Sequence, residues 1–234
     1  MAQPKETPLI ALAEDGAVIP TGIGDLRRFR AWLHSKCFPE RGRIDWIGGR
    51  LEVDMAAEDL YTHGTPKSAI ACVLGKLIQE PERGLVFIDK ARYTCPAVDL
   101  SVEPDILVLL VETLEAGRAR LVPRSRGPRN RFIEIEGSVD LVVECVSDSS
   151  TAKDRKRLPL AYHRAGVREY WLVDARGPRL DFQILLRRPR RFEQSAAGKF
   201  GFALSAVLGR GVRLVRRRRG PGLVFFHLEV EEEN

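Results

Sequence analysis

Two acidic residues stand at the ends of two apolar segments of the chain. Asp105 follows Pro104 and leads directly into the apolar run 106–111, and Glu144 lies near the end of the run 141–145. Such runs are typical of strands that are covered on both faces, where a carboxylate has to be solvated, paired or bound to a metal ion. These two residues are therefore the first candidates for chemistry.

If the two strands are neighbours, Asp105 and Glu144 can converge on a divalent cation. Carboxylate oxygens with a few retained waters are the ligands that Mg²⁺ prefers. Such an ion could lower the pKa of a bound water and neutralise the charge of a phosphodiester, and a lysine should then lie near the water. The alternative is a structural pair of carboxylates with lysine or arginine neighbours.

The segment 140–174 has to position Glu144. Its pattern predicts an apolar strand, a polar loop, a short helix and a second apolar strand that ends at Asp174. Gly166 suits the C-cap of the helix, because the next strand begins at once. A strand-helix-strand unit of this kind builds a mixed or parallel sheet.

Hydrophobic spacing predicts the remaining elements. Apolar residues at helical spacing predict a short amphipathic helix near 26–33 and a second helix within 65–79, with Pro66 in its first turn. The glycines 48–49 predict a hairpin turn. Residues 112–138 are rich in Arg, Gly and Pro and are expected to form an excursion. The C-terminal part is expected to consist mainly of short strands at the sheet edge.

Length and composition favour one large α/β domain. The chain has 234 residues, of which 44% are hydrophobic and 30% charged. We expect a single domain over residues 21–234, preceded by a poorly ordered arm or an edge strand in residues 1–20. Neither an 18-residue apolar run nor a signal-peptide pattern occurs, which predicts a cytoplasmic protein without a membrane partner. Four widely spaced cysteines indicate neither a zinc site nor a disulfide framework.

The basic balance of the chain makes an anionic partner plausible. The formal net charge is +6 and the pI is near 9.3. One basic run could track nucleic-acid phosphates: Arg216, Arg217, Arg218 and Arg219. A solvated face is the alternative for such a run, which in either case carries no sequence information.

Several of these pieces together resemble a known family. The segments VEPDILVLL, DLVVECVSDSST and AYHRAGVREYWLVDARG, with Asp154 between the last two, resemble the Uma2 family of bacterial endonucleases in the restriction-endonuclease-like, PD-(D/E)XK superfamily. The resemblance extends over residues 22–230 by order of elements, and its most specific piece is 162–174. It implies a central mixed sheet flanked by helices, with a strand-rich C-terminal part.

The resemblance also implies roles for the acidic residues. Asp105 would be the acid of the PD motif and Glu144 the second acid, and both would hold Mg²⁺, with Mn²⁺ as an alternative. The superfamily places a lysine two residues after the glutamate, where this chain has Val146. In Uma2-like sequences this lysine lies in the following helix, at the position occupied here by Leu158.

A displaced lysine is therefore expected. Lys156 is the candidate catalytic lysine and Lys153 the reserve. Pro159 fits the helix if the helix begins near Arg155, because a proline deeper inside would clash with the preceding turn. On that prediction Lys156 lies in the first turn and its side chain can reach back toward Glu144.

Two further residues match the family pattern less specifically. His63 corresponds to the histidine ahead of the second helix, and Glu52 lies on the strand before it. Either could assist the metal site or contact a phosphate. A hydrogen-bonded surface histidine and a solvated glutamate are the alternatives.

The resemblance implies Mg²⁺-dependent hydrolysis of nucleic-acid phosphodiesters, with DNA as the expected substrate and a homodimer as a plausible assembly. One alternative is a nucleic-acid-binding module that keeps the fold and has lost cleavage, for which the displaced lysine is the best support. The other is a structural or interaction protein whose basic runs are simply solvated.

Overall fold

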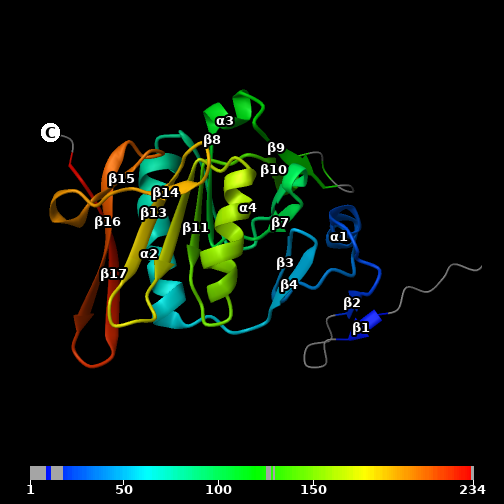
Figure 1. The fold of residues 1–234 in the computed structure, drawn as a ribbon, viewed down its shortest axis with the longest axis horizontal. Helices are drawn as coiled ribbons and strands as arrows, with labels where there is room; N and C mark the ends of the chain where they lie inside the picture. The colour runs from blue at the N-terminus through cyan, green and yellow to red at the C-terminus, as the bar shows by residue number, and fades with distance from the viewer. Residues whose placement is uncertain (1–8, 12–17, 125–127, 129, 233–234) are drawn as a thin grey trace, which may run out of the picture.

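The computed structural model describes residues 9–11, 18–124, 128 and 130–232. A six-stranded mixed sheet forms its centre (Figure 1). In spatial order its strands are β14 (Phe192–Gln194), β13 (Asp181–Arg187), β12 (Glu169–Asp174), β11 (Leu141–Cys145), β8 (Ile106–Leu110) and β5 (Gly84–Ile88). β11 and β12 are parallel and the other neighbours antiparallel. The predicted strand-helix-strand unit and the predicted pairing of the two apolar strands are both confirmed.

Three further sheets accompany the central one, and one of them also has six strands. The second sheet contains β4 (Arg50–Asp54), β3 (Arg43–Ile47), β7 (Leu100–Val102), β6 (Tyr93–Cys95), β10 (Phe132–Gly137) and β9 (Ala119–Pro123). The third contains β15 (Ala203–Ser205), β16 (Arg210–Arg219) and β17 (Leu223–Val230). A short hairpin pairs β1 (Leu9–Ala11) with β2 (Val18–Pro20). β2 lies where an edge strand was expected, and most of the expected arm lies outside the described residues.

The α-helices are α1 (Leu26–Leu33), α2 (Thr65–Leu74), α3 (Val111–Glu115) and α4 (Leu158–Arg164). Wide π turns adjoin two of them: η1 (Leu60–Gly64) and η2 (Gly75–Gln79) flank α2, and η4 (Lys153–Arg157) precedes α4. Two short 3₁₀ turns are η3 (Pro96–Val98) and η5 (Lys199–Gly201). None of the described helices is long and apolar enough to cross a membrane.

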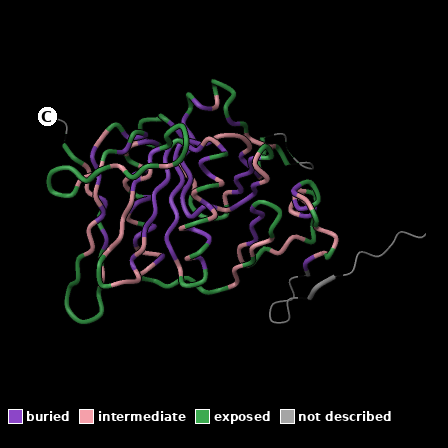
Figure 2. Tube along the Cα trace, in the orientation of Figure 1, coloured by how far each residue is buried: buried purple, intermediate pink, exposed green. Residues whose placement is uncertain are grey.

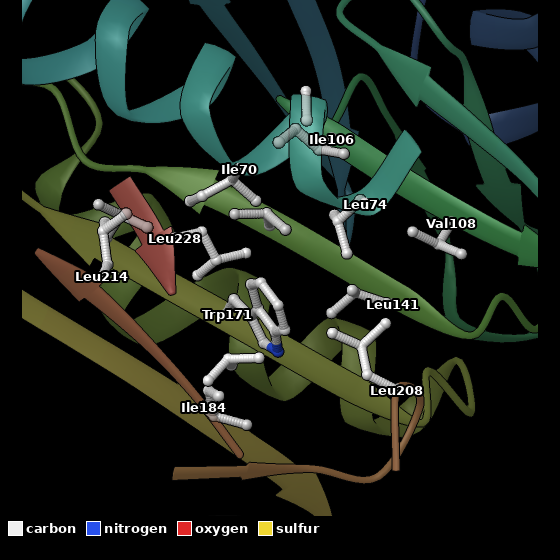
Figure 3. Packing of buried hydrophobic residues seen from close by; sticks show 14 of the residues in the cluster. Ile70, Leu74, Ile106, Val108, Leu141, Trp171, Ile184, Leu208, Leu214 and Leu228 are labelled. Carbon is white, nitrogen blue, oxygen red and sulfur yellow. The ribbon is translucent and has the colours of Figure 1, made fainter. Parts of the chain in front are cut away.

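The central sheet is buried on both faces, as Figure 2 shows for its middle strands. On one face α2 and the third sheet pack around Trp171, with Ile70, Leu74 and Leu228 among its neighbours in the cluster (Figure 3). On the other face a second cluster joins the sheet to α4 and to strands of the second sheet. The alternation of side chains along each strand therefore serves two separate cores.

A proline follows two of the wide turns, and each of these helical segments begins earlier than predicted. Pro66 is the second residue of α2 and Pro159 the second of α4, but η1 and η4 continue each helix toward its N-terminus. In both turns a backbone N–H bonds five residues back, Thr65 to Leu60 and Leu158 to Lys153. This wider register relieves the clash that a proline ring makes with a regular preceding turn.

Side-chain hydroxyls replace the N–H groups that the two prolines lack. The carbonyl five residues before Pro159 belongs to Asp154, and it accepts a hydrogen bond from the Tyr170 hydroxyl at 2.9 Å. The corresponding carbonyl before Pro66 belongs to Tyr61 and accepts from the Thr65 hydroxyl at 3.4 Å. The wide turns are thus satisfied parts of the fold.

The prediction of a simple excursion over residues 112–138 was wrong. This segment holds most of α3 and the antiparallel pair β9 and β10, and β10 also pairs in parallel with β6. Few of their residues are buried, since only Ala119, Glu134 and Ile135 are so among the described positions of the two strands. The sparse apolar pattern explains why the strands were missed.

Gly137 lies where β10 meets β9, and its replacement tests this pairing. A Cβ at Gly137, where φ is +120°, would lie 2.3 Å from the Arg118 carbonyl oxygen. At the control position Gly117, where φ is +67°, it would meet nothing within 4 Å. We expect unfolding free energy to fall by about 1–2 kcal/mol in Gly117→Ala through backbone strain alone. Gly137→Ala should lose about 3 kcal/mol or more, because the contact adds to the strain. Denaturant titration measures both, and equal losses would contradict the pairing.

Candidate active site

The two sequence-predicted carboxylates lie opposite one another across two strands. β8 and β11 pair with Val143 opposite Ile106, so continuing the register by one residue puts Glu144 opposite Asp105. Residues opposite each other in an antiparallel pair project from the same face. Both side chains are buried, with 3% and 0% of their residue surface exposed. The structure therefore brings Asp105 and Glu144 together at one end of the central sheet.

Asp105 is held as an anion. Its Oδ2 atom accepts a hydrogen bond from the Cys145 N–H at 2.6 Å, and its Oδ1 atom accepts from Arg43 at 3.0 Å. His63 Nε2 lies 3.3 Å from Oδ2. Burial alone would raise the pKa of Asp105, but the hydrogen bond with His63 and the positive charge of Arg43 lower it well below its usual range.

Glu144 is in a different state. Its Oε1 atom accepts from the Tyr162 hydroxyl at 2.6 Å and its Oε2 atom from Arg43 at 2.9 Å. Burial, reinforced by the negative charges of Asp105 and Asp154, raises the pKa of Glu144 to about 7, although Arg43 opposes the shift. Two adjacent carboxylates therefore differ in charge, one ionised and one close to its midpoint at neutral pH.

Arg43 was missed in the sequence. It lies on β3, and its guanidinium donates to Asp45 at 3.1 Å as well as to Asp105 and Glu144. Arg43 and Asp45 alternate with the buried apolar residues Ile44 and Trp46, so both project from one face of the strand. Charged residues alternating in a short strand are the signal that could have pointed to them.

The structure separates the two candidate lysines. Lys153 is 5% exposed, and its Nζ donates to Asp45 Oδ2 at 3.2 Å. Lys156 is exposed on the outer side of the helical segment. The helix begins at Thr151 and not near Arg155, which carries Lys156 away from the acidic residues and leaves Lys153 beside them.

The other two lysine positions of the family pattern are closed to a charge. Val146 and Leu158 are both fully buried in the apolar cluster between the sheet and α4. A lysine at either position would have to leave its ammonium group in this core without water. The valine at position 146 is therefore consistent with the packing of this chain.

Asp154 adds a further buried carboxyl next to the pair. Its Oδ2 atom accepts from the Ser150 hydroxyl, while its Oδ1 atom has no hydrogen-bond partner among the described residues. Burial raises the pKa of Asp154 to about 6, with the charge of Asp105 contributing and Lys153 opposing. This group is a buried carboxyl with one oxygen that no described residue binds.

His63 also reaches the acidic pair. It lies in η1, is 7% exposed, and its Nδ1 atom is 3.4 Å from Glu58 while Nε2 faces Asp105. Burial lowers the pKa of His63, but the hydrogen bond with Asp105 and the charges of Asp105 and Glu58 raise it overall. Lys67, which sequence reasoning missed, donates to Glu58 at 2.7 Å and to Asp89 at 2.8 Å from the start of α2.

Glu52 is placed near the group but has its own partner. It accepts a hydrogen bond from Arg157 at 2.9 Å. It also lines a small cavity of about 40 Å³ together with Arg43, Asp45 and Lys153. Such a space is large enough for a water molecule.

A larger cavity of about 310 Å³ opens onto Asp105. Asp105, His63 and Arg43 form part of its wall, and the loop residues Ser147 and Ser149 form another part. The carboxylate of Asp105 can therefore be reached from outside the protein.

The donor atoms fit a cation that needs few protein ligands. The described residues contain no group of three or more His, Cys, Asp or Glu arranged to hold a metal ion. Asp105 and Glu144 nevertheless supply two carboxylates that share one cationic group, Arg43. One or two carboxylates with several waters suffice for Mg²⁺, whereas a closed zinc site needs four ligands. The residues fit the first kind of ion.

The basic run lies in β16, where it is only partly free for a ligand. Arg216 donates to the carbonyls of Ala175, Gly177 and Pro178. Arg217 pairs with Glu229 at 3.2 Å. Arg218 and Arg219 are exposed near the tip of the β16–β17 hairpin. Ala175–Pro178 follow the C-terminal end of β12, which is parallel to β11. The hairpin therefore lies toward the same end of the central strands as Glu144 (Figure 1).

Known proteins resemble this chain in sequence and in fold. The model of the Uma2 family, described as "Putative restriction endonuclease", matches residues 27–197. The fold is similar to the crystal structure of "a putative nuclease belonging to DUF820" from Anabaena variabilis, with a TM-score of 0.56 and 18% identity over 79% of this chain and 90% of that one. No curated protein matches the chain. This structural likeness agrees with the predicted mixed α/β, restriction-endonuclease-like fold.

The matched segment contains both carboxylates, His63 and Lys153, while the basic run of β16 lies beyond it. The family match covers most of the chain. This chain belongs to the Uma2 family.

Proposed function

We propose that this protein is a metal-dependent nuclease that hydrolyses phosphodiester bonds in DNA. The observation that carries the proposal is the meeting of Asp105 and Glu144 across neighbouring strands, beside a cavity open to the outside. Burying two neighbouring carboxylates costs free energy unless a positive charge, from the protein or from a ligand, compensates them. The printed descriptions of the family and of the structural neighbour support the same class of activity.

In this proposal Asp105 and Glu144 hold Mg²⁺, with Mn²⁺ as the alternative. Such an ion would lower the pKa of a bound water and neutralise charge on the phosphate. Asp105 suits this task because its lowered pKa keeps it ionised, and the Cys145 N–H fixes the orientation of its carboxylate. His63 Nε2 lies beside the same oxygen, Oδ2, and supports this orientation.

Lys153 replaces Lys156 as the proposed cation. Its ammonium group lies among Asp45, Glu144 and Asp154, and it lines the cavity of about 40 Å³. A buried ammonium group in this place can orient a water and stabilise negative charge that develops on the phosphate. The exposed Lys156 has no such surroundings.

Nucleic acid would approach the end of the central sheet at which the cavity of about 310 Å³ lies. Arg43 lines the cavity, and Arg218 and Arg219 extend positive charge toward the same end. Contacts of this kind bind phosphates without reading sequence and weaken as salt rises. Cutting both strands of a duplex would need two such sites, so we also propose a homodimer, which light scattering in solution can test.

A cleavage assay tests the proposed function. Supercoiled plasmid, single-stranded DNA and RNA are incubated with the protein in Mg²⁺, in Mn²⁺ or in EDTA. We expect nicked or linear plasmid in either metal and none in EDTA, because the carboxylate pair cannot activate water alone. Binding without cutting in every metal would contradict the nuclease and favour a binding module. Absence of binding even at low salt would favour a structural or interaction protein.

A further inference from the structure

One guanidinium group lies at the centre of the acidic cluster. Arg43 Nη1 is 3.0 Å from Asp105, Nη2 is 2.9 Å from Glu144, and Nε is 3.1 Å from Asp45. The Arg43 side chain is 21% exposed, whereas each of the three carboxylates is nearly fully buried. The planar fork of arginine thus joins two strands of the central sheet to β3 of the second sheet.

A metal ion held by the same two carboxylates would need the oxygens that Arg43 now occupies. Asp105 Oδ1 and Glu144 Oε2 face the guanidinium, while Asp105 Oδ2 and Glu144 Oε1 accept from Cys145 and Tyr162. A second cation beside the first would be repelled strongly in so little water. Arg43 and a divalent ion therefore exclude one another from the pair.

The surroundings allow Arg43 to leave. Asp45, its third partner, keeps Lys153 at 3.2 Å and Arg92 at 3.6 Å. Arg43 already lines the cavity of about 310 Å³, so its guanidinium has space on the open side. A phosphate in that cavity would provide the anionic partner that Arg43 gives up, in a bidentate contact.

We propose that Arg43 is the resident cation of the Asp105 and Glu144 pair, and that a divalent metal ion binds by displacing its guanidinium into the cavity. The inference rests on the proposed function, because it takes the carboxylate pair as the metal site. In the displaced position Arg43 binds a phosphate of the substrate. The metal ion then binds the carboxylates and the nucleic acid binds Arg43, so each ligand breaks the same ion pair. Binding of one therefore favours binding of the other.

Metal binding in the absence of nucleic acid tests this competition. Mn²⁺ is titrated into the wild type and Arg43→Met, with free Mn²⁺ followed by its EPR signal, and thermal unfolding is measured with and without the ion. We expect Arg43→Met to bind Mn²⁺ at least tenfold more tightly than the wild type. Mn²⁺ should also raise its Tm more, because the ion then supplies the missing positive charge.

Arg157→Met is the matched control. Arg157 is a neighbouring cation whose partner is Glu52 and not the pair, so its removal reports the general effect of losing one positive charge. It should bind Mn²⁺ as the wild type does. If Arg43→Met fails to fold without metal, Arg43→Lys keeps the charge but cannot bridge both carboxylates, and it should bind Mn²⁺ with intermediate affinity.

Equal Mn²⁺ affinity in the wild type and Arg43→Met would overturn the inference, as would weaker binding in the variant or no binding in either protein. None of these measurements uses cleavage. A tighter-binding Arg43→Met together with a wild type that cuts no nucleic acid would sustain the competition and contradict the proposed nuclease.

Discussion

Asp105→Asn and Glu144→Gln are each expected to reduce the rate of DNA cleavage by about 10³-fold or more, because a metal ion contributes several kcal/mol of stabilisation to the transition state. Each substitution removes an anionic ligand and preserves the shape of the side chain. In Asp105→Asn the new amide oxygen can still accept the hydrogen bond from the Cys145 N–H, and in Glu144→Gln it can still accept from the Tyr162 hydroxyl. In each variant the amide NH2 then faces the Arg43 guanidinium, a donor opposite a donor, so folding has to be checked beside the loss of charge.

Single-turnover cleavage at saturating Mg²⁺ measures the effect, with circular dichroism as the check on folding. Glu193→Gln is the control, since Glu193 is an acid in an exposed ion pair with Arg191 and lines neither cavity. It should cleave within about threefold of the wild type, as a surface ion pair contributes little. Wild-type rates in both Asp105→Asn and Glu144→Gln would show that the pair is structural.

Lys153→Met is expected to lower the cleavage rate by about 10²-fold, the loss typical of removing one positioned charge from an active site. Lys156→Met should leave the rate unchanged within about twofold, because water and salt screen the charge of a solvent-exposed ammonium group from the acidic residues. The two lysines lie on the same helical segment, one buried beside Asp45 and the other exposed.

Comparison of the two lysine variants separates catalysis from stability. Lys153 also pairs with Asp45, so thermal unfolding of Lys153→Met has to be measured beside cleavage. An unchanged KM with a reduced kcat would indicate loss in the transition state. The opposite pattern, activity lost in Lys156→Met and kept in Lys153→Met, would return the role to Lys156.

The carboxylate pair could be predicted from the sequence because its signal is local. A polar residue at the end of an apolar run is visible without knowledge of the fold, and Asp105 and Glu144 each have this pattern. Their meeting required the assumption that these two apolar strands are neighbours, and β8 and β11 do pair. Apolar strands covered on both faces have few other places to go than the centre of a sheet.

Arg43 could not be predicted in the same way. It is separated from Asp105 by 62 positions and from Glu144 by 101, and it lies in a short strand of mixed polarity. Its position depends on how the second sheet packs against the first. The spacing of residues in the sequence does not reveal contacts of this kind. β9 and β10 were overlooked for a related reason: β10 pairs with the distant β6, and β9 has few buried apolar residues.

The preference for Lys156 over Lys153 depends on a rule about proline that holds for regular helices. Under that rule Pro159 requires a helix start near Arg155. The chain instead widens the turn over residues 153–157 and continues the helix through the proline. The lysine nearer to the start of the helix then faces the acidic group.

The two wide turns that precede prolines, η1 and η4, also determine at which step the active-site side chains lose their conformational entropy. His63 belongs to η1 and Lys153 to η4, and a proline follows each turn while Tyr170 or Thr65 holds a carbonyl of it. These side chains lose their conformational entropy as the helices form and pack on opposite faces of the sheet. His63 and Lys153 therefore lose little further entropy when a substrate binds. Less of the binding free energy is then offset by ordering these side chains.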